Sequence, residues 1–261
     1  MIWWVAFVVL EIDVVGRESR MKFTFATTTA PPQQTCFAWQ DRMRCMVESI
    51  RKQNIPEYEI IIVGGPAVTT GRHTFSLHNR DDIVHVPFDE ETGIEGKGKQ
   101  WCDENQIKQG GWITKKKNLI TETAKYENIV YFHDYHAFMP GWYEGYLQFG
   151  DDWDICMNLI NDIWGNRFRD WISWDHPHYP KRGLMDITDK EAAKHAYISG
   201  SYWVAKKKFM QENPLNEELV YGDAEDLEWS LRVRDKAKYV MNPHSVVRHI
   251  RPKYTGDEPR I

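Results

Sequence analysis

The sequence predicts an α/β protein with a doubly wound, mostly parallel central sheet flanked by helices. Short runs rich in β-branched and aromatic residues alternate with segments whose apolar residues recur at helical spacing. Several of these runs end in turns rich in glycine and polar residues, and an open α/β sheet binds its ligands beyond the carboxyl ends of its strands. The 261 residues suffice for one large domain or two small ones.

The composition argues against a general affinity for nucleic acid. A net charge of −5 and a pI near 6.1 give no overall attraction for polyanions, so any anionic ligand must be held by local groups. The four cysteines form no C-x-x-C pair, which predicts free core thiols in a reducing, cytoplasmic compartment. The sequence has 12 tryptophans; some belong to the core, and others are candidates for a sugar-stacking surface.

Residues 1–20 are expected to be an N-terminal extension of unclear role. The apolar run from Met1 to Leu10 is about half as long as a membrane-spanning helix. It lacks the basic region and cleavage site of a signal peptide. An extra strand, a peripheral helix and an added extension remain open, and so does a position at the periphery of a membrane. No transmembrane segment is predicted.

Residues 21–136 predict the opening of a doubly wound domain. Strands are expected at 22–26, 58–63 and 82–87, with a polar loop at 27–32 and a helix at about 38–53. The second strand ends at Gly64-Gly65 and the third at Phe88-Asp89. Such an order of strands and helix is typical of parallel pairing.

A basic cluster lies on the helix predicted for residues 112–125. Lys115, Lys116 and Lys117 are consecutive there. A run of lysines is usually a solvated face of a helix. Because this helix leads directly into the next predicted strand, at 126–132, the same lysines could also lie close to a nucleotide.

The central motif directly follows that strand. Asp134 and His136 come after the apolar run 129–132, and side chains two apart on an extended segment point the same way. Carboxylate and imidazole ligands together suit Mn²⁺, and Mg²⁺ less well. A solvated polar loop is the competing interpretation.

Residues 137–261 predict a second half with helices at 142–149 and 206–213 and strands at 153–160, 195–205 and 237–241. The aromatic-rich segment 161–182 is either a sugar-binding surface or a flap that packs its rings inward. Its His176-Pro177-His178 run could bind metal, but no third ligand lies close in the sequence. Gly200, in the middle of the strand 195–205, marks a close approach of backbone or ligand.

An acidic cluster follows Gly222. Asp223 is expected to cap the next helix, and Glu225 and Asp226 fall in its first turn, where the helix dipole favours negative charge. Capping alone would account for these acids. Their place after a glycine turn on the ligand side of a sheet favours a catalytic role.

Together these motifs resemble the GT-A glycosyltransferases, especially family 2-like enzymes and the polypeptide N-acetylgalactosaminyltransferases. The resemblance covers about residues 22–251 and implies one GT-A domain at 21–261. It further implies a nucleotide-binding half at about 21–136 and an acceptor-binding half at about 137–261. Asp134-Tyr135-His136 looks like a D-x-H variant of the D-x-D metal motif. His249 matches the family's third metal ligand, and His244 is the second candidate.

The resemblance also implies a reaction. The enzyme would move a sugar from a nucleotide-diphosphate donor, with UDP the commonest carrier and GDP and dTDP open, to a hydroxyl of a glycan or other acceptor. Asp226 would be the general base, Glu225 would bind the acceptor, and inversion would follow. The predicted donor contacts are Thr27, Thr28, Asp89, Lys116, Lys117 and Asp134, and the predicted metal is Mn²⁺ or Mg²⁺.

One position departs from the family pattern. Many members carry an acidic residue after the second strand, where this chain has Gly64-Gly65, so the contact to the base of the nucleotide is left open. Two alternatives belong to other classes: a metal-dependent nucleotide-sugar hydrolase or nucleotidyltransferase, and a non-catalytic carbohydrate-binding protein. Turnover of a nucleotide sugar with and without an acceptor separates them.

Overall fold

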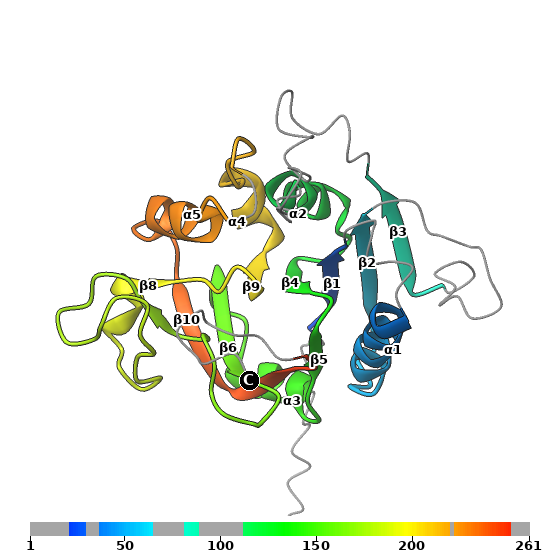
Figure 1. Ribbon diagram of the computed structural model, residues 1–261, viewed down its shortest axis with the longest axis horizontal. Coiled ribbons are helices and arrows are strands. Elements are labelled where there is room, and N and C mark those ends of the chain that lie inside the picture. Colours follow the sequence, from blue (N-terminus) through cyan, green and yellow to red (C-terminus); the bar gives the residue numbers. More distant parts are fainter. Residues whose placement is uncertain (1–20, 30–36, 65–80, 89–111, 220–221, 252–261) are drawn as a thin grey trace, which may run out of the picture.

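The computed structural model describes residues 21–29, 37–64, 81–88, 112–219 and 222–251. An eight-stranded sheet in the order β3-β2-β1-β4-β9-β6-β10-β5 forms its centre. Helices α2, α4 and α5 lie on one side of the sheet and α1 and α3 on the other (Figure 1). The α/β class and the helix-flanked sheet predicted from the sequence are therefore confirmed.

The first half of the sheet is parallel. Strands β1 (Phe23–Thr28), β2 (Tyr58–Gly64), β3 (Ile83–Pro87) and β4 (Asn128–His133) run in one direction, with β1 between β2 and β4. Helices α1 (Phe37–Arg51) and α2 (Ile113–Thr123) complete this half. Alternation of strand and helix with parallel pairing agrees with the pattern read from the sequence.

The second half is mixed. Its strands are β5 (His136–Phe138), β6 (Ile155–Asn161), β9 (Tyr202–Lys206) and β10 (Tyr239–His249). β9 is antiparallel to both β4 and β6, whereas β10 is parallel to β6 and antiparallel to β5. Its helices are α3 (Trp142–Phe149), α4 (Lys207–Glu212), α5 (Glu225–Val233) and a 3-10 turn η3 (Ala192–His195). A separate ribbon pairs β7 (Ile172–Ser173) with β8 (Ala196–Tyr197).

The sheet must curl because β4 and β5 are nearly contiguous in the chain. Four steps of the strand order separate them, which would be about 19 Å in a flat sheet. His133 ends β4 and His136 begins β5, so the chain between them reaches at most about 11 Å. The far edge of the sheet therefore returns to the carboxyl end of β4 and brings β10 with it.

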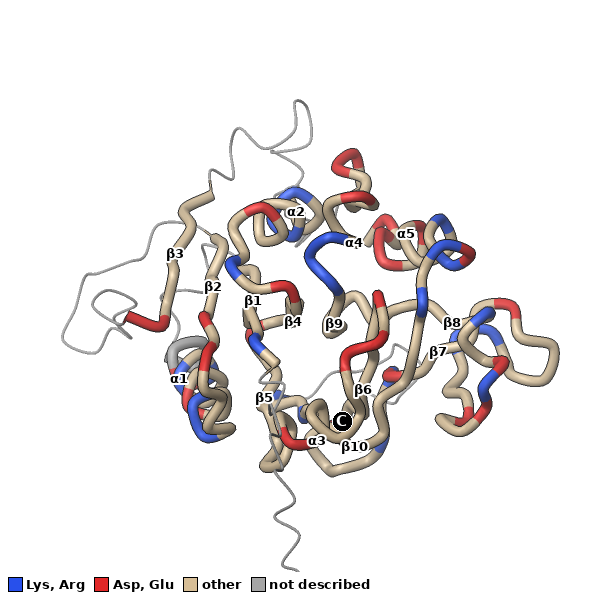
Figure 2. The backbone as a smooth tube through the Cα atoms, turned by 180° about the vertical axis from the view of Figure 1, so that it is seen from behind, with Lys and Arg blue, Asp and Glu red and all other residues tan. Residues whose placement is uncertain are grey.

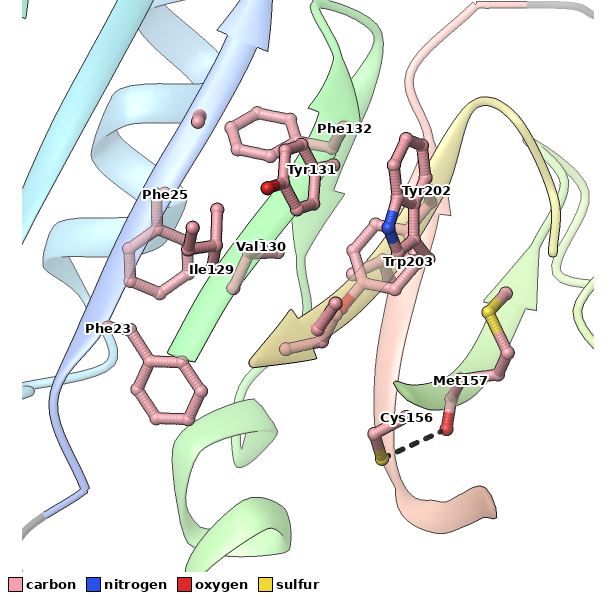
Figure 3. Packing of buried hydrophobic residues seen from close by; sticks show 14 of the residues in the cluster. Phe23, Phe25, Ile129, Val130, Tyr131, Phe132, Cys156, Met157, Tyr202 and Trp203 are labelled. Carbon is pink, nitrogen blue, oxygen red and sulfur yellow. Dashed lines mark hydrogen bonds between the residues drawn. The ribbon is translucent and has the colours of Figure 1, made fainter. Parts of the chain in front are cut away.

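The core lies between the sheet and its helices. Phe23 and Phe25 of β1, Tyr131 of β4 and Trp203 of β9 are buried within it (Figure 3). The rings of Tyr131 and Trp203 stack with centroids 4.6 Å apart. This buried, aromatic core holds the strands in place, and the candidate reactive side chains lie at the strand ends.

Several predicted elements are corrected. The strand expected at 195–205 is two strands, β8 and β9, because the chain turns at Gly200. The last strand runs on to His249 across a register shift between Asn242 and Val246. Thr27 and Thr28 belong to β1 and not to the loop after it. Cys156 is a buried free thiol as predicted, whereas Cys45 is exposed.

Other predictions fall outside the described residues. These are the N-terminal extension 1–20, Asp89, Cys36 and Cys102. Within the described part of the chain, none of the helices combines the length and apolar character needed to cross a bilayer.

Candidate active site

The acidic pair of α5 follows an unusual turn. Gly222 has a φ of 97° and Ala224, the residue before the helix, has a φ of 58°. Ala224 occupies the N-cap position, and no side chain caps the helix there, so the predicted capping by Asp223 is wrong. A non-glycine residue with such a φ is strained. The turn sets Glu225 and Asp226 at the head of the helix.

Asp226 is fixed by the segment that precedes β9. The backbone amide of Gly200 donates to its Oδ2 at 2.9 Å, and the amide of Leu227 donates to Oδ1 at 2.9 Å. A Cβ at Gly200 would lie 2.6 Å from Oδ2. Glycine is therefore required here, and the close approach predicted at this position is that of the Asp226 carboxylate.

A second link ties α5 to the same segment. Ser230 donates its hydroxyl proton to the Asp226 carbonyl at 2.6 Å, and the Ile198 amide donates to the Ser230 oxygen at 3.0 Å. The orientation of Asp226 therefore follows from several contacts.

Glu225 is buried beside Lys117. The Lys117 Nζ lies 3.8 Å from Glu225 Oε1 and donates to the Gly200 carbonyl at 3.0 Å. It also lies 4.5 Å from the centroid of the Trp203 ring. Burial raises the pKa of Glu225, and the positive charge of Lys117 opposes that shift. Lys117 thus acts as an internal support for the acidic pair.

Lys116 is also internal. Its Nζ donates to the Thr29 carbonyl at 2.8 Å and lies 5.3 Å from the centroid of the Phe88 ring. Only 3% of Lys116 and 2% of Lys117 is exposed, although both were predicted as donor contacts. Figure 2 shows basic positions on α2 and acidic ones at the start of α5. Lys116 and Lys117 join α2 to the segments that follow β1 and precede β9.

A pocket of about 350 Å³ opens over the acidic pair. Its polar lining comes from the end of β4, the turn before β9, the head of α5 and the segment around β7, and it comprises His133, Arg169, Arg182, Ser199, Ser201, Glu225 and Asp226. Because His133 is the last residue of β4, the pocket lies beyond the carboxyl end of a parallel strand. That is where an α/β sheet binds ligands.

Strained backbone gathers around this pocket. The described non-glycine residues with positive φ are Asn54, Arg169, Arg182 and Ala224. The last three line the pocket. Such conformations cost about 1–3 kcal/mol each and concentrate at functional sites, so the distribution supports this pocket as the candidate site.

The central motif turns where an extended segment was predicted. Asp134 and Tyr135 form a turn between β4 and β5. The His136 Nδ1 donates to the His133 carbonyl at 3.2 Å, and Asp134 Oδ2 lies 3.6 Å from an Nη of Arg42. The premise that Asp134 and His136 alternate along one strand is wrong. Their side chains are placed by the turn.

His136 and His249 meet across the edge of the sheet. They are register partners in β5 and β10, and their ring centroids lie 4.7 Å apart. β10 therefore brings His249 next to the central motif. His244 is exposed at the register shift of β10. No group of three or more His, Cys, Asp or Glu side chains in the described ranges is arranged to hold a metal ion, and Asp134 is turned toward Arg42.

In the aromatic segment 161–182, some rings pack inward, as in a flap, and others are exposed, as on a sugar-binding surface. Trp171 is buried, whereas Trp164 is 61% exposed. His176 is buried with its Nε2 3.5 Å from an Asp189 carboxylate oxygen. This segment also carries Arg169 and Arg182, which sequence reasoning missed, as it missed His133, Ser199 and Ser201. An irregular segment has no period to signal them.

The fold resembles solved glycosyltransferase structures. S. aureus TarS 1-349 in complex with UDP-GlcNAc matches with a TM-score of 0.56 at 12% identity, over 92% of this chain and 62% of that one. GalNAc-T7 with UDP, GalNAc and Mn²⁺ matches with a TM-score of 0.58 at 14% identity, over 93% and 46%. The chain spans 36% of a longer TarS chain. The predicted GT-A fold is confirmed.

Sequence comparison adds no relative. No family model matches the chain, and no curated protein matches it.

Proposed function

We propose that the chain is a metal-dependent glycosyltransferase that moves a sugar from a UDP-linked donor to a hydroxyl acceptor with inversion. The observation that carries the proposal is the fixed Glu225–Asp226 pair on the wall of a pocket beyond the end of β4. The GT-A fold supports it, because the similar structures named above hold UDP-GlcNAc in one case and UDP with Mn²⁺ in another.

In the proposed reaction Asp226 is the general base. The acceptor hydroxyl gives its proton to an Asp226 carboxylate oxygen. Its own oxygen then bonds to the anomeric carbon while the bond from that carbon to the diphosphate breaks. UDP leaves with the electron pair of the broken bond. The amides of Gly200 and Leu227 hold the carboxylate in one orientation, and Glu225 binds the acceptor.

On the donor side we propose Asp134, His136 and His249 as the ligands of Mn²⁺ or Mg²⁺. The close, edge-to-face approach of the His136 and His249 rings supports two of the three positions. Asp134 would exchange its contact with Arg42 for the metal. Bound there, a divalent ion supplies positive charge that stabilises a leaving diphosphate.

The two halves of the chain then divide the substrates. Residues of about 21–136 would hold the donor, with Thr28 and Asp89 on the nucleoside side. Residues of about 137–261 would hold the acceptor. Thr28 lies half-buried at the end of β1, which is the correct end of the sheet for such a contact.

Turnover of nucleotide sugars tests the proposal. Purified protein is incubated with UDP-GlcNAc or UDP-GalNAc, with Mn²⁺ or with EDTA, and released UDP is measured with and without a mixture of glycan acceptors. We expect release that requires Mn²⁺ and rises with acceptor. Equal release without acceptor would favour the hydrolase, and glycan binding without any turnover would favour the carbohydrate-binding protein.

A further inference from the structure

The pocket over the acidic pair has two arginines on its wall. Arg169 is half-buried and Arg182 is exposed, and both line the pocket that contains Asp226. Burial raises the pKa of Tyr197, which also lines the pocket. The charge of Asp226 adds to this shift, and the charges of Arg169 and Arg182 oppose it.

These two guanidinium groups differ from six other described arginines, which are ion-paired. Six others form ion pairs with described carboxylates, namely Arg42, Arg44, Arg51, Arg167, Arg232 and Arg234. Arg169 and Arg182 have no ion pair or side-chain hydrogen bond with any residue that the structure describes. The five donors on each planar group therefore have no partner among the described residues.

The backbone holds both arginines at a cost. Their φ values are 45° for Arg169 and 64° for Arg182, a conformation that non-glycine residues rarely adopt. The Arg182 amide donates to the Ser173 carbonyl at 2.7 Å, which fixes the turn. Strain of this kind persists where the surroundings impose it, and it is found at ligand-binding positions.

We infer that Arg169 and Arg182 bind an anionic group of the acceptor, a phosphate or a carboxylate, beside the hydroxyl that Asp226 deprotonates. The inference rests on the proposed function and names the substrate class of that same site. A guanidinium group binds either anion through two parallel hydrogen bonds. The volume of about 350 Å³ falls within the range of small-molecule sites, about 300–1,000 Å³.

The position in the pocket assigns the arginines to the acceptor and not to the donor diphosphate. They share the pocket wall with Asp226, whereas Asp134, His136 and His249 do not line it. A carboxylate base would also repel an anionic acceptor. Two adjacent positive charges offset that repulsion, so an acceptor of this class requires them here.

Binding of matched sugars tests the inference. Protein saturated with UDP and Mn²⁺ is titrated with glucose 6-phosphate, glucuronate and the neutral control methyl glucoside. The variants are Arg169→Gln and Arg182→Gln. Arg44→Gln serves as the charge control because Arg44 is an exposed arginine of α1 that pairs with Asp41. UDP affinity is measured for every protein.

We expect the wild type to bind at least one anionic sugar about tenfold or more tightly than methyl glucoside. Arg169→Gln and Arg182→Gln should each bind that sugar about tenfold more weakly than wild type. Arg44→Gln should bind it as tightly as wild type. The preferred sugar separates phosphate from carboxylate. Exposed Arg182 should be replaceable without loss of fold, and Arg182→Lys, which retains the charge, should bind better than Arg182→Gln.

Two results would overturn the inference while UDP still binds. One is equal affinity for neutral and anionic sugars. The other is a loss of UDP affinity in Arg169→Gln or Arg182→Gln, which would place the arginines on the donor. A wild type that binds no UDP overturns the proposed function itself, and the acceptor assignment with it.

Discussion

Two pairs of basic residues lie near the candidate site, and their surroundings are opposite. Lys116 and Lys117 of α2 are almost fully buried, and their ammonium groups donate to the carbonyls of Thr29 and Gly200. Arg169 and Arg182 lie on the pocket wall, without ion pairs to other described residues, on strained backbone. Both pairs come from segments that the sequence marked as candidates for ligand binding.

The degree of burial distinguishes the lysines, which stabilise the site, from the arginines, which can bind a ligand. A buried ammonium group must satisfy its hydrogen bonds inside the protein, and Lys117 does so by joining α2 to the acidic pair. An arginine with free donors in a pocket can satisfy them with a ligand. The lysines therefore fix the site in place, while the arginines select what enters it.

The largest expected effect is that of replacing Asp226, which lines the pocket together with Arg169 and Arg182. Asp226→Asn keeps the size of the side chain and removes the proposed base, so transfer should fall by about 10²–10⁴-fold. UDP affinity should stay within about twofold of wild type. Radiolabel transfer and calorimetric titration measure the two quantities. Full transfer activity in the variant would remove Asp226 from the role of base.

Lys117→Met tests the assignment of the lysines to support. Removing the ammonium group leaves buried Glu225 without its positive neighbour, so the free energy of unfolding should fall by about 3 kcal/mol. Urea denaturation measures it. Lys115→Met on the same helix is the control, and since Lys115 is only half-buried it should cost less than about 1 kcal/mol. If Lys117→Met bound UDP more weakly at unchanged stability, Lys117 would be a donor contact and not a structural support.

Gly200→Ala tests how tightly the turn before β9 holds the Asp226 carboxylate. The added methyl group would lie 2.6 Å from the Asp226 Oδ2 and must displace the carboxylate. We expect kcat to fall about tenfold or more, because small misplacements of catalytic groups are costly, with UDP affinity unchanged. Unchanged kcat would show that the observed orientation of Asp226 is not the reactive one.

The smallest effect is a dependence of stability on pH. Burial raises the pKa of Glu225 above its value in the unfolded chain, so the folded protein binds this proton more tightly. Stability is therefore highest below the unfolded pKa and falls as pH rises from there through the folded pKa. Glu225→Gln should lack this fall. The unfolding free energy of both proteins is measured from pH 4 upward. The positive charge of Lys117 opposes the rise in the Glu225 pKa, so it makes the difference between the two proteins smaller.

Local sequence patterns located most of the elements. The helix expected at 142–149 is α3 (Trp142–Phe149), and the strand expected at 58–63 is β2 (Tyr58–Gly64). These succeed because apolar periodicity and turn residues act within a few positions of one another. The acidic pair of α5 was also located, because a glycine turn precedes it in the sequence.

What sequence reasoning missed depends on contacts between distant segments. The antiparallel insertion of β9 between β4 and β6 is a choice of partners that no local pattern encodes. The turn at Asp134-Tyr135 follows from the curl of the whole sheet. Arg182 is held beside β7 by the hydrogen bond from its amide to the Ser173 carbonyl. The carbonyls that accept from Lys116 and Lys117 belong to Thr29, after β1, and to Gly200, before β9.

The central claim is a donor site for a nucleotide diphosphate that depends on metal. Calorimetric titration of UDP, with GDP and dTDP for comparison, against wild type and Asp134→Ala, each with and without Mn²⁺, tests it most directly. We predict that UDP binds wild type only with Mn²⁺ and that Asp134→Ala binds it at least about tenfold more weakly. Absence of nucleotide binding, or binding that ignores both Mn²⁺ and Asp134, would contradict the account.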